Sequence, residues 1–201
     1  MRKKVIAIII SAFIGTLSNA NADSAVQSLL KCDSTFFKEI KNIAGLLEIS
    51  NKLDKTVIEK QSEISIPVKY TSPEGIKITK FTVSYTDFDK FKELGIKGPQ
   101  GKYYYWGVET PQSINQVVKI LSKNNKLIKD GDVYIYNPMI RIGKNGKWQA
   151  NKFASQGTMP SKEITEKVAI IEKNPNGVSI NCSLQGSVNK KDLIAAGLHK
   201  K

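Results

Sequence analysis

The most distinctive local pattern in this chain is a run of four aromatic residues: Tyr103, Tyr104, Tyr105 and Trp106. In a strand, successive side chains point to opposite faces, so Tyr103 and Tyr105 share one face while Tyr104 and Trp106 share the other. One face must contribute to the core. We predict that the other presents its rings to a sugar, a peptide or a partner protein, because rigid amphipathic rings favour binding. The alternative is a strand buried on both faces beneath helices.

Side chains that commonly perform catalysis are scarce. The chain has one histidine, His199, close to its end, which excludes Ser-His-Asp and Cys-His arrangements and histidine-based zinc sites. Ser28 and Lys31 match the S-x-x-K pattern of penicillin-recognising enzymes, but no K-T-G follows, so we interpret the match as coincidence. Residues 130–132, Asp-Gly-Asp, lack the closing glutamate of a calcium loop and are interpreted as a turn.

The acidic residues leave one enzymatic alternative open. A glycoside hydrolase uses two carboxylates that can lie far apart in the sequence, and the chain has 18 Asp and Glu residues from which such a pair could come. No particular pair is indicated. The sequence therefore predicts no catalytic residue, no metal site and no cofactor, and a hydrolase with a carboxylate pair stays as the alternative.

The N-terminus has the pattern of a cleavable export signal. Three positive residues precede an apolar stretch over 5–17, which is shorter than the roughly 20 residues of a membrane-spanning helix. Ala20 and Ala22 then form an A-x-A site. We predict cleavage after Ala22, leaving Asp23 as the first mature residue; cleavage after Ala20 and an uncleaved anchor are the alternatives. Residues 23–201 then form one exported domain without a transmembrane segment.

Both cysteines, Cys32 and Cys182, belong to the mature part. In an oxidising compartment an isolated pair favours a disulfide, here joining the start of the domain to its end. The alternative is a reactive or metal-binding thiol, which the missing C-x-x-C spacing and the absence of a nearby histidine disfavour.

Positive charge dominates the chain. The formal charge is +13, and loss of the three positive residues of the signal lowers it to +10. The only arginines are Arg2 and Arg141, and a lysine-rich, arginine-poor protein is atypical of base recognition, so we expect no nucleic-acid partner. The scattered lysines indicate either a solvated surface or attraction to anionic lipid or cell-wall polymer. Candidate contacts for the second interpretation are Lys102, Lys119, Lys123 and Lys126.

Two apolar patterns predict the main helices. Phe36 to Leu47 carries apolar residues at three- and four-residue spacing, and Ile114 to Leu121 carries a similar stripe. For the second helix, Thr110 and Pro111 have the residue types of an N-cap and a first helical position. A further short helix is expected over 87–94, and the tail after Ser187 is expected to hold one short helix and then fray.

Alternating apolar residues predict the strands. A hairpin is expected over 63–86, with Pro67 marking a sheet edge and a change of parity indicating a bulge. Strands follow over 102–108, 133–136 and 139–142, and residues 168–184 form a last hairpin around an Asn-Gly turn. The fold class is therefore α+β: a mostly antiparallel sheet built from hairpins, two main amphipathic helices packed on it, and one disulfide.

Together these features predict a soluble bacterial protein of the periplasm or the exterior. The leading hypothesis is a non-enzymatic binding protein for another protein or an envelope component. The alternatives are an envelope hydrolase with a carboxylate pair and a cationic binder of anionic lipid or cell-wall polymer.

Overall fold

The computed structural model describes residues 24–43, 46–47, 55–93, 95, 98–156, 160 and 162–199. The expected signal over 1–22 and its cleavage site between Ala22 and Asp23 lie outside these residues. Among the helices described, none has both the length and the apolar character needed to cross a membrane.

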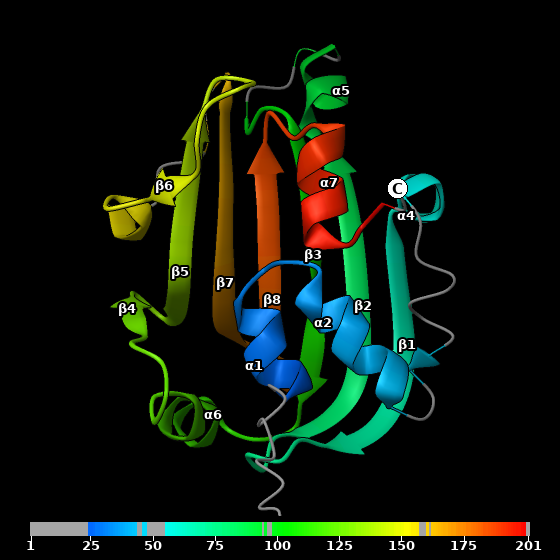
Figure 1. Cartoon of the computed structure of the whole chain (residues 1–201), viewed down its shortest axis with the longest axis vertical. Helices are drawn as coiled ribbons and strands as arrows, with labels where there is room; N and C mark the ends of the chain where they lie inside the picture. Colours follow the sequence, from blue (N-terminus) through cyan, green and yellow to red (C-terminus); the bar gives the residue numbers. More distant parts are fainter. Residues whose placement is uncertain are drawn as a thin grey trace, which may run out of the picture.

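One antiparallel sheet organises the described part of the chain (Figure 1). Its main path runs β1-β2-β3-β8-β7-β5-β4, and β6 pairs with β5. The strands are β1 Glu63–Thr71, β2 Lys77–Asp87, β3 Lys102–Thr110, β4 Ile128–Asp130, β5 Val133–Ile142, β6 Gln149–Ala150, β7 Ile164–Asn174 and β8 Gly177–Gly186. The predicted α+β class with a mostly antiparallel sheet is thus confirmed.

The predicted hairpins are present with their irregularities. β1 lies at an edge of the sheet, as Pro67 indicated, and the β1–β2 register shifts by one residue between Pro67 and Tyr70. β7 and β8 pair across the Asn-Gly turn, where Gly177 has a φ of +140°. The two strands expected over 133–142 are one strand, β5, with a register shift after Tyr136 where Asn137 has a φ of +49°.

The helices are short. They are α1 Ala25–Leu30, α2 Thr35–Glu39, the 3-10 turn η1 Ile40–Asn42, α4 Lys55–Gln61, α5 Phe88–Glu93, α6 Ile114–Leu121, the 3-10 turn η2 Ala154–Gln156 and α7 Lys190–Ala196. In Figure 1, α1, α2 and α7 lie over one face of the sheet, which we call the helix face. α4 and α5 lie near one end of the sheet and α6 near the other.

The prediction of two main amphipathic helices is not confirmed. Among the described residues of the first pattern, α2 and η1 end where the chain becomes extended at Ile43, with φ −101° and ψ 119°, and Leu47 is helical again, so the pattern is not one continuous helix. The second helix keeps its apolar stripe but starts later than predicted. Thr110 is the last residue of β3, and Ser113 caps α6 through a capping box with Gln116.

The core lies between the helices and the helix face. Across the sheet, Val83, Trp106, Cys182 and Ala169 face one another in register, and all are buried. α7 closes this layer: its C-cap Gly197 lies against the Phe37 ring, and Ser34 N–H donates to the Ala195 carbonyl at 2.8 Å.

The expectation that the tail frays is wrong through Leu198, which is fully buried. His199 follows it and is half-buried.

A buried ion pair fixes α7 to the sheet. Arg141 on β5 and Asp192 on α7 are 5% and 6% exposed, and Arg141 Nη2 lies 2.8 Å from Asp192 Oδ2. The same guanidinium donates to Thr165 Oγ1 at 2.8 Å, and Asp192 Oδ2 also accepts from Asn189 N–H at 2.8 Å. These hydrogen bonds offset much of the cost of burying two charges, although Arg141 Nε is buried without a hydrogen-bond partner.

Candidate functional site

Cys32 and Cys182 form a disulfide, as predicted. Their Cα atoms are 5.4 Å apart, and the two residues are 2% and 0% exposed. Cys32 lies in the turn between α1 and α2, and Cys182 lies in the middle of β8. The bond therefore joins the N-terminal helices to the centre of the sheet and is shielded from solvent.

The aromatic strand does not form the exposed platform that its sequence suggested. Tyr104 and Trp106 are fully buried on the helix face, and Tyr103 on the opposite face is 3% exposed. Only Tyr105 is half-buried. This is a correction to the predicted binding surface, and its physical reason is that α5 covers part of the second face: the Phe88 and Tyr103 ring centroids are 4.8 Å apart.

A pocket at one end of the sheet gathers several polar groups. It has a volume of about 490 Å³, within the range of small-molecule sites. Residues from α4, the end of β2 and α5 line it, and we call it the tyrosine–carboxylate pocket. Its lining residues are Glu59, Ser62, Tyr85, Thr86, Asp87, Lys90 and Phe91.

Two buried tyrosines orient the two carboxylates of this pocket. Tyr104 OH donates to Glu59 Oε1 at 2.6 Å, and Tyr85 OH donates to Asp87 Oδ2 at 3.3 Å. The Tyr85 and Tyr104 rings pack at a centroid distance of 4.8 Å. A residue of the aromatic run thus supports the pocket from the core side, although its ring is not accessible.

The phenols of this region stay protonated well above neutral pH. Burial raises the pKa of Tyr104 far above its usual value, and the hydrogen bond to Glu59 adds to the shift. Burial also raises the pKa of Tyr85, and the nearby negative charge of Asp87 is the second-largest cause of that shift. Burial raises the pKa of Tyr103 to about 12, and the electrostatic interaction with Tyr105 is the second cause. All three phenols are protonated at physiological pH; Tyr85 and Tyr104 donate the hydrogen bonds described above, whereas the buried Tyr103 hydroxyl has no partner.

Alkaline pH should therefore destabilise the protein. The unfolded chain ionises its tyrosines near pH 10.0, below the folded-state pKa values of Tyr85, Tyr103 and Tyr104. The stability that these neutral phenols contribute is complete below pH 10.0 and is lost as the pH rises through their folded-state values. Thermal melts from about pH 9 to about pH 12, followed by circular dichroism and tyrosinate absorbance, measure this. Titration of all tyrosines near pH 10 in the folded protein would contradict it.

Lys102 also belongs to this end of the sheet. Its Nζ lies 4.0 Å from Glu59 Oε1, and its backbone pairs with Asp87 across β3 and β2. Lys119, Lys123 and Lys126 are exposed on α6 and the turn after it, beyond the other end of β3. A nine-residue strand spans about 27 Å, so the structure separates Lys102 from the other three candidate cationic contacts.

Ser62 holds α4 against the pocket in an unusual conformation. Its φ is +59°, a left-handed value that non-glycine residues rarely adopt. Ser62 N–H donates to the Ile58 carbonyl at 3.0 Å, and the Ser62 carbonyl accepts from Tyr85 N–H at 2.7 Å. The end of α4 is thereby tied to β2, at the point where both carboxylates line the pocket.

A Ser62→Gly substitution should stabilise the protein by about 0.5–1 kcal/mol, because glycine adopts positive φ without the Cβ clash. The matched control is Ser122→Gly, whose φ of −68° gives glycine no such advantage and predicts a loss of stability. Urea unfolding of the two variants and the parent protein gives both values. Equal destabilisation by the two substitutions would refute the strain at Ser62.

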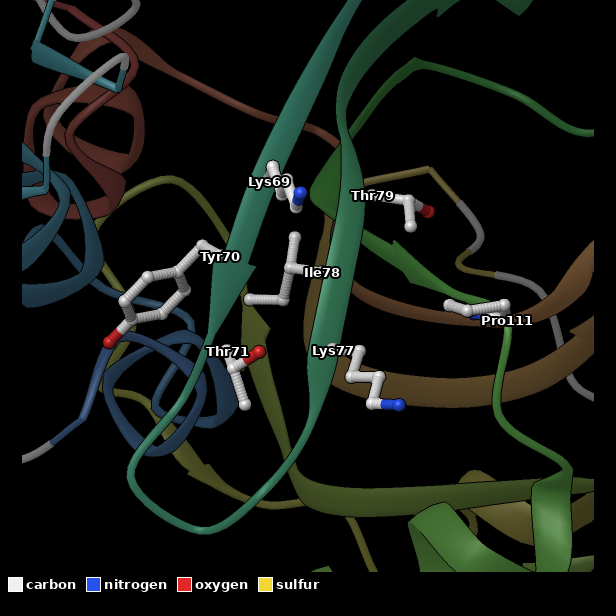
Figure 2. A pocket seen from close by; sticks show the side chains of 7 residues that line it. All are labelled: Lys69, Tyr70, Thr71, Lys77, Ile78, Thr79 and Pro111. Carbon is white, nitrogen blue, oxygen red and sulfur yellow. The ribbon is translucent and has the colours of Figure 1, made fainter.

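A second pocket, of about 570 Å³, lies at the opposite end of the β1–β2 hairpin (Figure 2). Its lining contains two lysines and no carboxylate: Lys69, Tyr70, Thr71, Lys77, Ile78, Thr79 and Pro111. In Figure 2, Lys77, Thr79 and Pro111 extend to one side of the hairpin and Tyr70 to the other.

Sequence reasoning missed Glu59 and Asp87. Glu59 lies in α4, for which no helix was predicted, and nothing local relates it to Tyr104, 45 residues away. One signal was available: Tyr85 and Asp87 are two residues apart at the end of a strand, so both side chains share a face. Residues 130–132, by contrast, form the predicted turn, between β4 and β5.

Within the described ranges, no group of three or more His, Cys, Asp or Glu side chains is placed to hold a metal ion. No family model, curated protein or solved structure matches this chain.

Proposed function

We propose that this chain is an exported binding protein whose ligand site is the tyrosine–carboxylate pocket. The observation that carries the proposal is the pair of phenol–carboxylate hydrogen bonds at 2.6 and 3.3 Å, which fix two carboxylates in the wall of a small-molecule-sized pocket. A binding site of this kind needs polar groups that are oriented before the ligand arrives. The buried disulfide supports export, because such bonds persist in oxidising compartments.

Photo-crosslinking in the producing cell tests this function without assuming a ligand. A benzophenone amino acid replaces Lys90, which lines the pocket, or Lys123, which is exposed beyond the opposite end of β3. The proposal expects ultraviolet-dependent adducts at position 90 and none at position 123. Equal labelling at both positions, or none at 90, argues against the pocket as the ligand site.

Mass analysis of the same exported protein tests its location. We expect a mature chain that starts at Asp23 and gains two mass units on reduction of the Cys32–Cys182 bond. Recovery of the uncleaved chain from the cytoplasm would contradict export.

A carboxylate-dependent hydrolase is the second candidate, favoured by the observation that Glu59 and Asp87 line one pocket. A general acid must hold a proton to give away, whereas both side chains here accept hydrogen bonds from tyrosines. We therefore rank binding above hydrolysis. Release of reducing sugar from cell-wall or glycan substrates by the purified protein, abolished by Glu59→Gln or Asp87→Asn, would reverse this ranking.

The second pocket favours a further candidate, a binder of anionic lipid or cell-wall polymer. Lys69 and Lys77 line it, and Lys119 on α6 lies near the same end of the sheet. This function predicts adsorption to anionic vesicles that falls steeply with salt and weakens in a Lys69→Gln/Lys77→Gln variant. Adsorption that salt does not change would exclude it.

A further inference from the structure

We propose that the tyrosine–carboxylate pocket takes a neutral saccharide; this inference rests on the binding function proposed above. Its first support is that charges of both signs meet at the pocket. Glu59, Asp87 and Lys90 line it, and Lys102 lies beside Glu59. A small ion of either sign therefore meets like charge as well as countercharge here.

The second support is the mixture of donors and acceptors. The carboxylates of Glu59 and Asp87 accept hydrogen bonds, and the Lys90 ammonium donates them. The hydroxyls of Ser62 and Thr86 can do both, and all five side chains line the same pocket. Sugar hydroxyl groups are also both donors and acceptors. A set of this composition therefore suits a hydroxyl-rich ligand better than an apolar one or a simple ion.

The third support is an aromatic ring in the lining. Phe91 on α5 is 42% exposed and lines the pocket beside its polar groups. Its ring centroid lies 5.9 Å from that of Phe88, which in turn packs edge-on against Tyr103. The ring is thus braced from the sheet side, and its accessible part can pack against the C–H face of a pyranose.

The orientation of the carboxylates gives the pocket its specificity. Tyr104 and Tyr85 reach Glu59 and Asp87 from the core, so these side chains lose little freedom when a ligand binds. We therefore assign Tyr104 as a positioning residue. Tyr104→Phe should weaken saccharide binding through Glu59 alone, so it should have no further effect in a Glu59→Gln background.

The test uses purified mature protein, residues 23–201, with four probes: maltotriose and N,N′-diacetylchitobiose as neutral saccharides, spermidine as a cation and inorganic phosphate as an anion. Titrations followed by amide NMR and calorimetry should show binding of at least one neutral saccharide, with shifts concentrated at residues 59–62 and 85–91. A Glu59→Gln or Asp87→Asn variant should weaken that binding by about 10-fold or more, since each loses a hydrogen bond to a charged group.

Matched controls separate the pocket from general effects of substitution. Glu109→Gln removes a carboxylate that pairs with Lys80 at 3.0 Å in a different part of the sheet, and it should leave the affinity unchanged. Phe91→Ala should weaken binding by about 10-fold, whereas Phe153→Ala, which removes a ring that is 62% exposed elsewhere, should not. Circular dichroism melts confirm that each variant is folded.

The outcomes distinguish the inference from the function on which it rests. Preferential binding of spermidine or phosphate at residues 59–62 and 85–91, or no saccharide binding at millimolar concentration, overturns the saccharide assignment. If crosslinks still form at position 90 in the cell, the pocket remains a ligand site for another class of molecule. If neither saccharide binding nor crosslinks at position 90 are observed, both proposals fail.

Discussion

A Cys32→Ala/Cys182→Ala variant is expected to lose about 5 kcal/mol of unfolding free energy. The bond closes a loop with a sequence separation of 150 residues, and in the chain-entropy description so long a loop restricts the unfolded chain strongly. Both cysteines are buried, so alanine also leaves a small cavity, which adds to the loss. Urea unfolding followed by tryptophan fluorescence measures the loss, which should appear as a midpoint about 2 M lower.

Reduction provides the matching control. Parent protein unfolded in dithiothreitol should approach the stability of the double alanine variant, while the variant itself should not respond to the reductant. A double variant with the parent midpoint would show that the disulfide contributes little to stability.

The second large effect is expected at the buried ion pair. Asp192→Ala should lower the unfolding free energy by about 3–5 kcal/mol, because it leaves the Arg141 guanidinium, 5% exposed, without its counter-ion. It also removes the acceptor of Asn189 N–H at the start of α7. Unfolding in urea gives the loss, and hydrogen exchange should show α7 opening first.

A double variant that lacks both charges tests the cause of that effect. Arg141→Met/Asp192→Leu removes both charges and should cost less than Asp192→Ala alone. The partly exposed pair Lys80–Glu109, 3.0 Å apart with side chains 35% and 18% exposed, is the comparison: Glu109→Ala should cost at most about 1 kcal/mol. Equal losses from the buried pair and the partly exposed pair would contradict the role assigned to burial.

The parts of the fold that the sequence predicted well depend on neighbouring residues. The β7–β8 hairpin follows from alternation on both sides of an Asn-Gly turn, and the edge position of β1 follows from the missing N–H of Pro67. The Cys32–Cys182 bond followed from the expected compartment and from there being only two cysteines. None of these needs knowledge of how distant segments pack.

The parts that failed depend on distant packing. Apolar spacing from Phe36 onward suits a helix, but it does not determine where tertiary contacts end that helix, and Ile43 is extended. The alternation of side chains along a strand correctly placed Tyr104 and Tyr105 on opposite faces of the sheet. It does not reveal that the face carrying Tyr103 is also covered. The tyrosine–carboxylate pocket needs α4, β2 and α5 together, so neither of its carboxylates carries a local signature.

The order of the strands has a consequence for how the chain is made. β8 lies between β3 and β7, so the strand that joins the two halves of the sheet is the last one to be synthesised. Until it is available, β1 to β3 and β4 to β7 cannot pair with each other, and Cys32 has no partner thiol. This sheet is therefore completed only after β8, Gly177–Gly186, is available, and a fragment that stops before residue 177 lacks the strand needed to connect its halves.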